Sequence, residues 1–158
     1  MSVSFDDDDK EFRRIQRDMK ALRGAFATAG IHEGAGSYPG GPTVAEVALF
    51  NEFGTETAPE RSFIRATMDI NKRKIADFAE FVLNDVILGL KTPKQAVNSL
   101  GFFGETLIKN RIQTSRNWAI PNTPAVTNAK IKGGAVFGPT PLIRSTLLLR
   151  SVTSRGSL

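Results

Sequence analysis

The sequence predicts an α+β fold in which a small antiparallel sheet packs against two or three long helices. Two observations lead to this prediction: three segments carry apolar residues at helical spacing, and one segment between them alternates like a strand. A chain of 158 residues fits one hydrophobic core, because single domains usually hold about 100 to 200 residues. We therefore expect residues 1–158 to form a single domain.

The first predicted helix covers residues 7–27. Its apolar residues recur at steps of three and four, which places them on one face: Phe12, Ile15, Met19, Leu22 and Phe26. Asp6 to Asp9 lie at its start, where the helix dipole favours negative charge. The run from Asp6 to Lys10 also matches a protease-cleavage tag, but the helical period continues through it and favours a native helix start.

A β-hairpin is predicted to follow this helix. Ile31 and His32 lie in its first strand, residues 37–42 form a turn rich in glycine and proline, and residues 43–53 form its second strand. The second strand ends at Gly54, which can adopt a positive φ at no steric cost. The expected sheet therefore consists of this hairpin and a later C-terminal strand.

Two long helices are predicted after the hairpin. The first runs from Ser62 to about Leu90, because Pro59 disfavours helix at the residue before it and an apolar stripe follows. The second begins after Thr92, where Thr-Pro-Lys-Gln forms a capping box, and continues to about Thr114. It contains two glycines, Gly101 and Gly104. Close contact between helices would explain why they are tolerated there.

A long loop is expected over residues 117–140, which are rich in proline, asparagine and glycine. Trp118 stands at its start and is interpreted as an anchor, either onto the edge of the core, which we favour, or onto a partner. Residues 141–150 are predicted to form a short helix and residues 151–155 a terminal strand.

The charge is distributed unevenly along the chain. Through Asp85 there are 11 basic and 15 acidic residues, whereas from Val86 onward there are 10 basic residues and one acidic residue, Glu105. The net charge is +5. Two interpretations stay open: the basic part faces a polyanion or an acidic partner surface, or its charges are simply solvated. The basic stripe of the first helix allows the same two interpretations: Lys10, Arg13, Arg14, Arg17 and Lys20.

Few groups that carry out catalysis are available. The chain has no cysteine and one histidine, His32, so thiolate chemistry and cysteine-ligated metals are excluded. Glu46 and Glu52 are expected on one face of the predicted strand. We interpret Glu52 as a scaffold residue that accepts backbone N–H groups after Gly54 or pairs with Arg61, in preference to a catalytic role. We expect no enzyme activity, no catalytic residue, no cofactor and no metal, and a soluble chain without a membrane span.

Two blocks of the sequence resemble one protein family. The first is Asn51-Glu52-Phe53-Gly54-Thr55 followed by Pro59 and Arg61-Ser62-Phe63-Ile64-Arg65. The second runs from Trp118-Ala119-Ile120-Pro121 through Lys130 to Pro141-Leu142-Ile143, Leu148 and Ser151-Val152. Both are similar to the neck and tail-completion proteins of tailed bacteriophages, including the virion-morphogenesis proteins of Mu-like phages. Arg144 and Thr146 depart from this pattern, since the family usually has aspartate and glycine there.

The resemblance implies a structural virion protein that forms a ring at the head–tail junction, joining the portal side to the tail. Its expected partners are further copies of itself, typically in a hexameric ring, other neck proteins, and tail tube or terminator proteins. DNA passing through the lumen is expected to make at most weak contact. The expected location is the virion, and the host cytoplasm during assembly. A tail terminator, a head-closure ring and a nucleic-acid-binding module that uses the basic C-terminal part are the alternatives.

The motif residues are the expected interface with other subunits or partners, which comprises Glu52, Phe53, Gly54, Arg61, Phe63, Arg65 and Trp118. Phe53 and Phe63 are expected to be buried and to fix the turn between them. Arg61 and Arg65 are then expected to project towards carboxylates of a neighbour, where a guanidinium gives orientation as well as affinity. The 117–140 loop is expected to reach the adjacent subunit of a ring.

Overall fold

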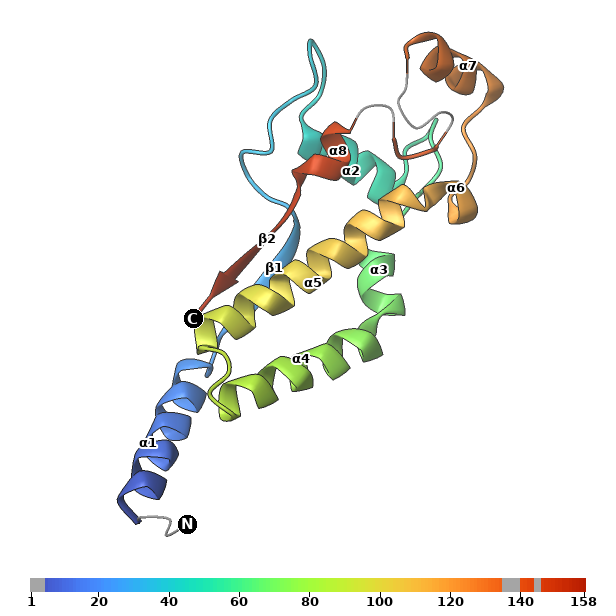
Figure 1. Cartoon of the computed structure of the whole chain (residues 1–158). Coiled ribbons are helices and arrows are strands. Elements are labelled where there is room, and N and C mark those ends of the chain that lie inside the picture. Colours follow the sequence, from blue (N-terminus) through green and yellow to red (C-terminus); the bar gives the residue numbers. More distant parts are fainter. Residues whose placement is uncertain (1–4, 135–139, 144–145) are drawn as a thin grey trace.

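The computed structural model describes residues 5–134, 140–143 and 146–158. Their elements follow in the order α1 (Phe5–Ala21), β1 (Phe26–Ile31), α2 (Val44–Phe53), α3 (Arg65–Ile70), α4 (Lys72–Ile87), α5 (Pro93–Gln113), α6 (Ser115–Trp118), α7 (Pro124–Lys132), α8 (Leu147–Ser151) and β2 (Val152–Ser157). In Figure 1, α5 crosses the middle of the molecule, with the two strands on one side and α4 on the other. The predicted α+β class, with a small sheet on long helices, is confirmed.

The sheet joins segments that are far apart in the sequence. β1 pairs with β2 in antiparallel register, from Phe26 opposite Ser157 to Ile31 opposite Val152. The terminal strand that the sequence predicts is therefore present. The predicted hairpin is wrong, because residues 43–53 form no strand and an isolated bridge between Ser37 and Thr43 is its only counterpart in the described residues.

α2 replaces the predicted second strand because a capping box starts a helix there. Thr43 Oγ1 accepts the Glu46 N–H at 3.2 Å, and the Glu46 carboxylate accepts the Thr43 N–H at 2.8 Å. The box satisfies two backbone donors at the first turn. Val44, Ala48 and Glu52 are then the buried residues of the helix, at steps of four. The apolar residues between them alternate in the sequence, but they lie on a helix and not on a strand.

α5 is the predicted helix, with its capping box between Thr92 and Gln95 in place. Its glycines face the sheet, so the prediction that they permit helix-on-helix contact is wrong. A Cβ added at Gly101 would lie 3.3 Å from Ser154 Cβ, and one at Gly104 would lie 3.2 Å from Ala29 Cβ. The absence of side chains here lets two small-residue strands lie directly on the helix.

The helix predicted over residues 62–90 is divided in two. α3 and α4 are separated at Asn71, whose φ of −103° and ψ of 12° end one helix and begin the next. Val82 and Val86 of α4 then pack with Ala96 of α5 in a small apolar cluster. This cluster attaches α4 to α5 along one side of α4.

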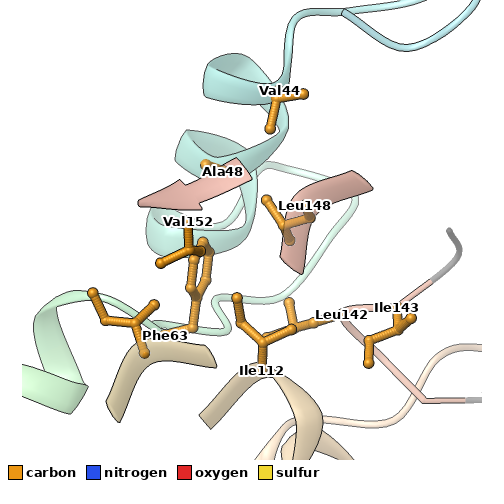
Figure 2. Packing of buried hydrophobic residues seen from close by; sticks show 9 residues of the cluster. Val44, Ala48, Phe63, Ile112, Leu142, Ile143, Leu148 and Val152 are labelled. Atoms are coloured by element: carbon orange, nitrogen blue, oxygen red, sulfur yellow. The ribbon is translucent and has the colours of Figure 1, made fainter. Parts of the chain in front are cut away.

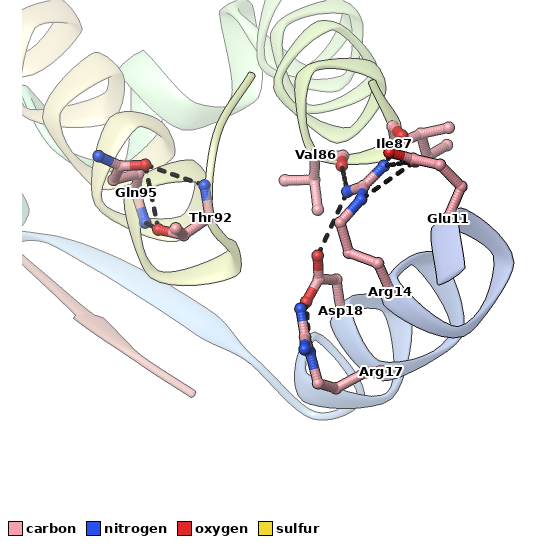
Figure 3. A network of polar contacts seen from close by, with 8 residues as sticks. All are labelled: Glu11, Arg14, Arg17, Asp18, Val86, Ile87, Thr92 and Gln95. Atoms are coloured by element: carbon pink, nitrogen blue, oxygen red, sulfur yellow. Dashed lines mark hydrogen bonds and ion pairs between the residues drawn. The ribbon is translucent and has the colours of Figure 1, made fainter. Parts of the chain in front are cut away.

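α1 ends at Ala21, six residues before the predicted end, because Gly24 turns the chain with a φ of 81° before β1 begins. The Arg14 guanidinium donates to the carbonyls of Val86 and Ile87 at 3.0 and 2.7 Å (Figure 3). These carbonyls lie at the C-terminal end of α4, where a cation is favourable. The N-terminal part of α1 projects beyond the body of the molecule in Figure 1.

The main core lies where α2, α5, α8 and β2 meet (Figure 2). Phe63, in the segment before α3, is fully buried among the residues of this core. The other buried members are Val44, Ala48, Ile108, Ile112, Leu142, Ile143, Leu148 and Val152. The core therefore brings the two motif blocks of the sequence into contact.

The predicted 117–140 loop is partly helical, since it contains α7 and the end of α6. Lys130 of α7 is buried, and its ammonium donates to the carbonyls of Thr140, Pro141 and Ile143 at 2.9, 2.9 and 3.3 Å. This contact ties α7 to the segment that enters the core. Of the short helix predicted over 141–150, the structure has α8; residues 135–139 and 144–145 lie outside the described residues. No helix in the described part is both long and apolar enough to cross a membrane.

The contact between α5 and the sheet predicts the effect of enlarging Gly104. Gly104→Val should lower the free energy of unfolding by about 1–3 kcal/mol, because the added Cβ would lie 3.2 Å from Ala29 Cβ and the two methyl groups would overpack the contact further. Urea unfolding measures this change. Asn110→Val, at an exposed position of the same helix, should change stability by only about 0.5 kcal/mol. Equal losses in the two variants would contradict close packing at Gly104.

Candidate functional site

The Glu52 carboxylate gathers four hydrogen-bond donors at the start of α3. One oxygen accepts the hydroxyl of Ser62 at 2.6 Å and the backbone N–H of Arg65 at 2.8 Å. The other accepts the backbone N–H groups of Phe63 and Ile64 at 2.9 and 3.0 Å. The interpretation of Glu52 as a scaffold residue that accepts N–H groups after Gly54 is confirmed. The N-cap residue of α3, Ile64, has no side-chain cap. The carboxylate of Glu52, which belongs to α2, instead accepts the free N–H groups at the start of α3.

Two opposing effects act on the protonation of Glu52. Burial raises the pKa of the carboxyl group, while the donors from Ile64, Ser62, Arg65 and Phe63 lower it. The donors prevail, and the pKa of Glu52 lies below its ordinary value. The carboxylate is thus the form of Glu52 that the folded chain stabilises.

Gly54 ends α2 with a φ of 75° and a ψ of 178°. A Cβ at this position would lie 2.9 Å from the backbone nitrogen of Glu60 and 3.1 Å from the carbonyl oxygen of Ala58. The positive φ predicted for Gly54 is confirmed, and close approach of the loop is a second reason for glycine here. The Arg61 N–H donates to the carbonyl of Asn51 at 2.6 Å and closes the loop.

Arg61 faces inward, which corrects the prediction that it projects towards a neighbour. Its side chain is 8% exposed, and it donates to the carbonyl oxygens of Ile120 and Pro121 at 2.8 and 3.4 Å. Those carbonyls come from the second motif block, which no local pattern connects with Arg61. The guanidinium is therefore used to join two loops of one chain.

Trp118 lies against the chain itself, as the favoured interpretation of an intramolecular anchor has it. Its indole N–H donates to the carbonyl of Arg111 at 2.8 Å, and the Arg111 guanidinium lies 3.9 Å from the centre of its rings. Arg111 also donates to the carbonyl of Ser62 at 3.1 Å. The same cation thus contacts both motif blocks and stacks on Trp118.

Phe53 is on the surface, so the prediction that it is buried is wrong. α2 turns it away from Glu52, and it is 61% exposed. The Arg65 guanidinium lies 5.3 Å from the centre of its ring and binds the Glu60 carboxylate. Leu49 and Phe50 are exposed beside Phe53 on the same helix. We refer to Leu49, Phe50, Phe53, Glu60 and Arg65 as the α2 platform.

An open hollow of about 250 Å³ lies beside the α2 platform. Its lining is mostly apolar and consists of Ile31, Ala45, Ala48, Leu49, Glu52 and Ile64. Glu52 reaches this hollow while its oxygens are occupied by backbone and Ser62 donors. The hollow therefore offers an apolar contact surface in place of a reactive carboxylate.

The seven residues predicted for the interface occupy two different environments. Phe53 and Arg65 are exposed, whereas Glu52, Arg61 and Phe63 are buried. Gly54 and Trp118 are partly covered. The buried residues Glu52, Arg61 and Phe63 hold the turn between α2 and α3, and the exposed residues Phe53 and Arg65 stand at its two ends. The structure also separates Glu46 from Glu52, because a helix turns residues six apart to different sides, and the predicted common strand face is wrong.

Sequence reasoning missed Arg111, which contacts both motif blocks. A basic residue in the last turn of a helix is the only local signal that it carries. Its burial lowers the pKa of its guanidinium, while the charge of Glu52 raises it. Leu49 and Phe50 were missed for another reason, since a strand would have alternated them between two faces.

Several basic residues after Val86 bind groups of their own chain. Lys91 pairs with Asp85, and Lys109 pairs with Glu105 at 2.6 Å. Arg111 and Lys130 donate to backbone carbonyls, as described above. The basic C-terminal part is thus partly used for internal contacts. Across the described residues, no three or more histidine, cysteine, aspartate or glutamate side chains gather as a metal site would require.

No family model matches the sequence, and comparisons with curated proteins and with solved structures find no match either.

Glu52→Gln should lower the free energy of unfolding by about 2–4 kcal/mol, since an amide nitrogen would face buried N–H donors. Chemical unfolding at neutral pH measures the loss. Glu56→Gln changes an exposed carboxylate in the adjoining loop and should alter stability by at most about 0.5 kcal/mol. A Glu52→Gln protein as stable as the Glu56→Gln protein would show that the four donors do not depend on the charge.

The lowered pKa of Glu52 also predicts a pH dependence of stability. The carboxylate stabilises the fold fully above the unfolded pKa of about 4.3, and this contribution disappears as the pH falls through the lower folded pKa. Unfolding free energies measured from pH 6 downward should therefore fall more steeply below about pH 4.3 for the unmodified chain than for Glu52→Gln. Parallel curves for the two proteins would refute this assignment.

Proposed function

We propose that this chain is a ring-forming structural subunit of the head–tail junction of a tailed bacteriophage. The proposal rests on the similarity of the two motif blocks to neck and tail-completion proteins, together with the surface that the chain leaves uncovered. In this role the chain binds further copies of itself and adjacent neck or tail proteins. It performs no reaction, and its function is to hold two large assemblies in register.

The size of the exposed surface is the observation that carries the association part of the proposal. The chain has an accessible surface of 10525 Å², whereas a compact monomer of 17.2 kDa exposes about 7,800 Å². Permanent assemblies bury roughly 2,000–5,000 Å² at their interfaces. The surplus surface of the single chain is of the size that such an assembly covers.

Much of this surface is apolar. Large exposed side chains include Leu49, Phe50 and Phe53 on α2 and Phe81, Leu83 and Ile87 on α4. Single exposed apolar residues are ordinary, but several on neighbouring turns of α2 and α4 indicate surfaces that bind protein. This pattern supports a subunit that acquires its final burial on assembly.

The α2 platform suits docking because its support is rigid. The Glu52 carboxylate and the Gly54 turn hold the loop beneath it, so Phe53 and Arg65 lose little freedom when a partner binds. An aromatic ring beside a guanidinium is a common centre of a binding surface. The internal contacts of Lys91, Lys109, Arg111 and Lys130 accord with a lumen that attracts DNA only weakly.

The location in the virion is tested by imaging. A tag at the C-terminus, labelled with gold in assembled particles, should mark the junction between head and tail in electron micrographs. A phage from which the gene is deleted should give separate heads and tails, and supplying the gene in the host should restore joined virions. Label along the tail or on the capsid faces would overturn the proposed location.

The α2 platform predicts which variant fails to assemble. Leu49→Ser together with Phe53→Ser should weaken assembly at least tenfold, because two exposed apolar side chains lose their burial against a neighbour. Light scattering after size-exclusion chromatography measures the mass, and circular dichroism checks the fold. Phe102→Ser, an exposed aromatic on α5, serves as the control and should assemble normally. Unchanged assembly of the double variant would remove the α2 platform from the interface.

A further inference from the structure

The face of α4 that points away from α5 carries an uncovered ridge. Glu80 and Asn84 of α4 and Leu88, the C-cap residue that follows the helix, stand at steps of four; all are exposed, and Leu88 is 69% exposed. The opposite face, with Val82 and Val86, packs on α5. The open side of α4 therefore carries a carboxylate and an amide that lead to one exposed apolar side chain at the C-cap, opposite the apolar face that packs on α5.

A ridge of the same spacing lies on α1. Phe12, Gln16 and Lys20 also follow at steps of four and are exposed, with Phe12 at 59%. α1 is attached to its own chain through other residues. Arg14 binds the end of α4 (Figure 3). Met19 and Leu22 pack on the small cluster between α4 and α5. The ridge is thus left free by the contact that α1 makes within the chain.

The two ridges complement each other when the helices run in opposite directions. Phe12 then lies opposite Leu88, Gln16 opposite Asn84, and Lys20 opposite Glu80. These three pairs match apolar with apolar, amide with amide, and ammonium with carboxylate. Ridges of residues four apart are those that interlock in the commonest class of helix packing. In the parallel direction Lys20 would meet Leu88 and Phe12 would meet Glu80, so the pattern specifies one orientation.

We propose that α1 of one subunit docks antiparallel on the outer face of α4 of a second copy of this chain. This inference rests on the proposed ring and names the contact between neighbouring copies. The occupant is a second copy because both halves of the complementary pattern stand on this sequence. No ion pair joins Lys20 or Glu80 to any residue that the structure describes, so both charges are available for this contact.

The contact uses two different surfaces of each subunit, α1 on one side and α4 on the other. Such a heterologous contact passes from copy to copy and generates a ring when its rotation closes. The apolar pair supplies most of the affinity, because exposed ion pairs contribute little. The pair of Lys20 with Glu80 instead fixes direction and register.

Exchange of the two charges tests the pairing. Lys20→Glu and Glu80→Lys should each raise the concentration for half-assembly by roughly threefold to tenfold. The double variant should return it to within about twofold of the unmodified chain, since the pair is restored with reversed signs. Sedimentation velocity over a concentration series measures this shift. Lys94→Glu, an exposed charge reversal in the first turn of α5, is the matched control and should have no effect.

Cysteine cross-linking tests the apolar pair, because the chain has no cysteine of its own. One preparation carries Phe12→Cys and another Leu88→Cys, and the two are mixed under mild oxidation. The mixture should form a covalent dimer that neither preparation forms alone. The variant with both cysteines should give a ladder up to the size of the ring. A ladder that stops at the dimer would indicate a closed two-fold pair and would overturn the head-to-tail contact.

The outcomes separate this inference from the proposed function. An assembled ring that ignores the charge reversals and forms no cross-link overturns the α1–α4 contact and leaves the ring standing. An unmodified chain that stays monomeric at all concentrations overturns both. Circular dichroism and melting curves of each variant establish that it is folded, so that a loss of assembly reports on the contact itself.

Discussion

The hydrogen bonding of the Glu52 carboxylate is the constraint on which the rest of the motif region depends. A charged group that is 7% exposed must be compensated, and here four donors from four consecutive residues do so. Those donors begin α3 and set Phe63 into the core. The same turn carries Arg61 inward and Arg65 outward. One acidic side chain on α2 therefore fixes the path of the chain between two helices.

The internally bonded loop between α2 and α3 supports the exposed apolar side chains of the α2 platform. The loop over residues 54–64 is held by Glu52, by the carbonyl of Asn51 and by contacts with residues 120–121. The α2 platform rests on this loop and on α2. A partner that binds a preformed surface loses less conformational entropy than one that must order a flexible loop. The internal contacts thus hold the exposed apolar side chains of α2 on a preformed support.

The sequence predicts those parts of the fold that local signals decide. The capping box at Thr92 and the long apolar stripe predict α5, and the class of fold follows from such helices. The same type of box stands at Thr43, yet the prediction there was a strand. The strand prediction rests on the alternating apolar residues after Thr43, whereas the buried row of α2 consists of Val44, Ala48 and the charged Glu52. The Glu52 carboxylate can be buried because four hydrogen-bond donors compensate its charge.

Other features depend on contacts that no local pattern contains. Arg61 and Arg65 are two arginines four positions apart, and the sequence assigns both to the surface. Burial of Arg61 is decided by carbonyls of residues 120–121, some sixty positions along the chain. Similarly, the small residues of β1 give no indication that its partner is β2. Long-range pairing of this kind becomes visible only when the whole chain is folded.

The distance in sequence between β1 and β2 has a consequence for how the protein is made. Residues 32–151 separate the two strands. During translation β1 therefore cannot pair with β2 until residues 152–157 have left the ribosome. Until then, the glycine face of α5 has only one strand to cover it. A newly made chain is therefore exposed to wrong association late in its synthesis, before β2 covers this face of α5.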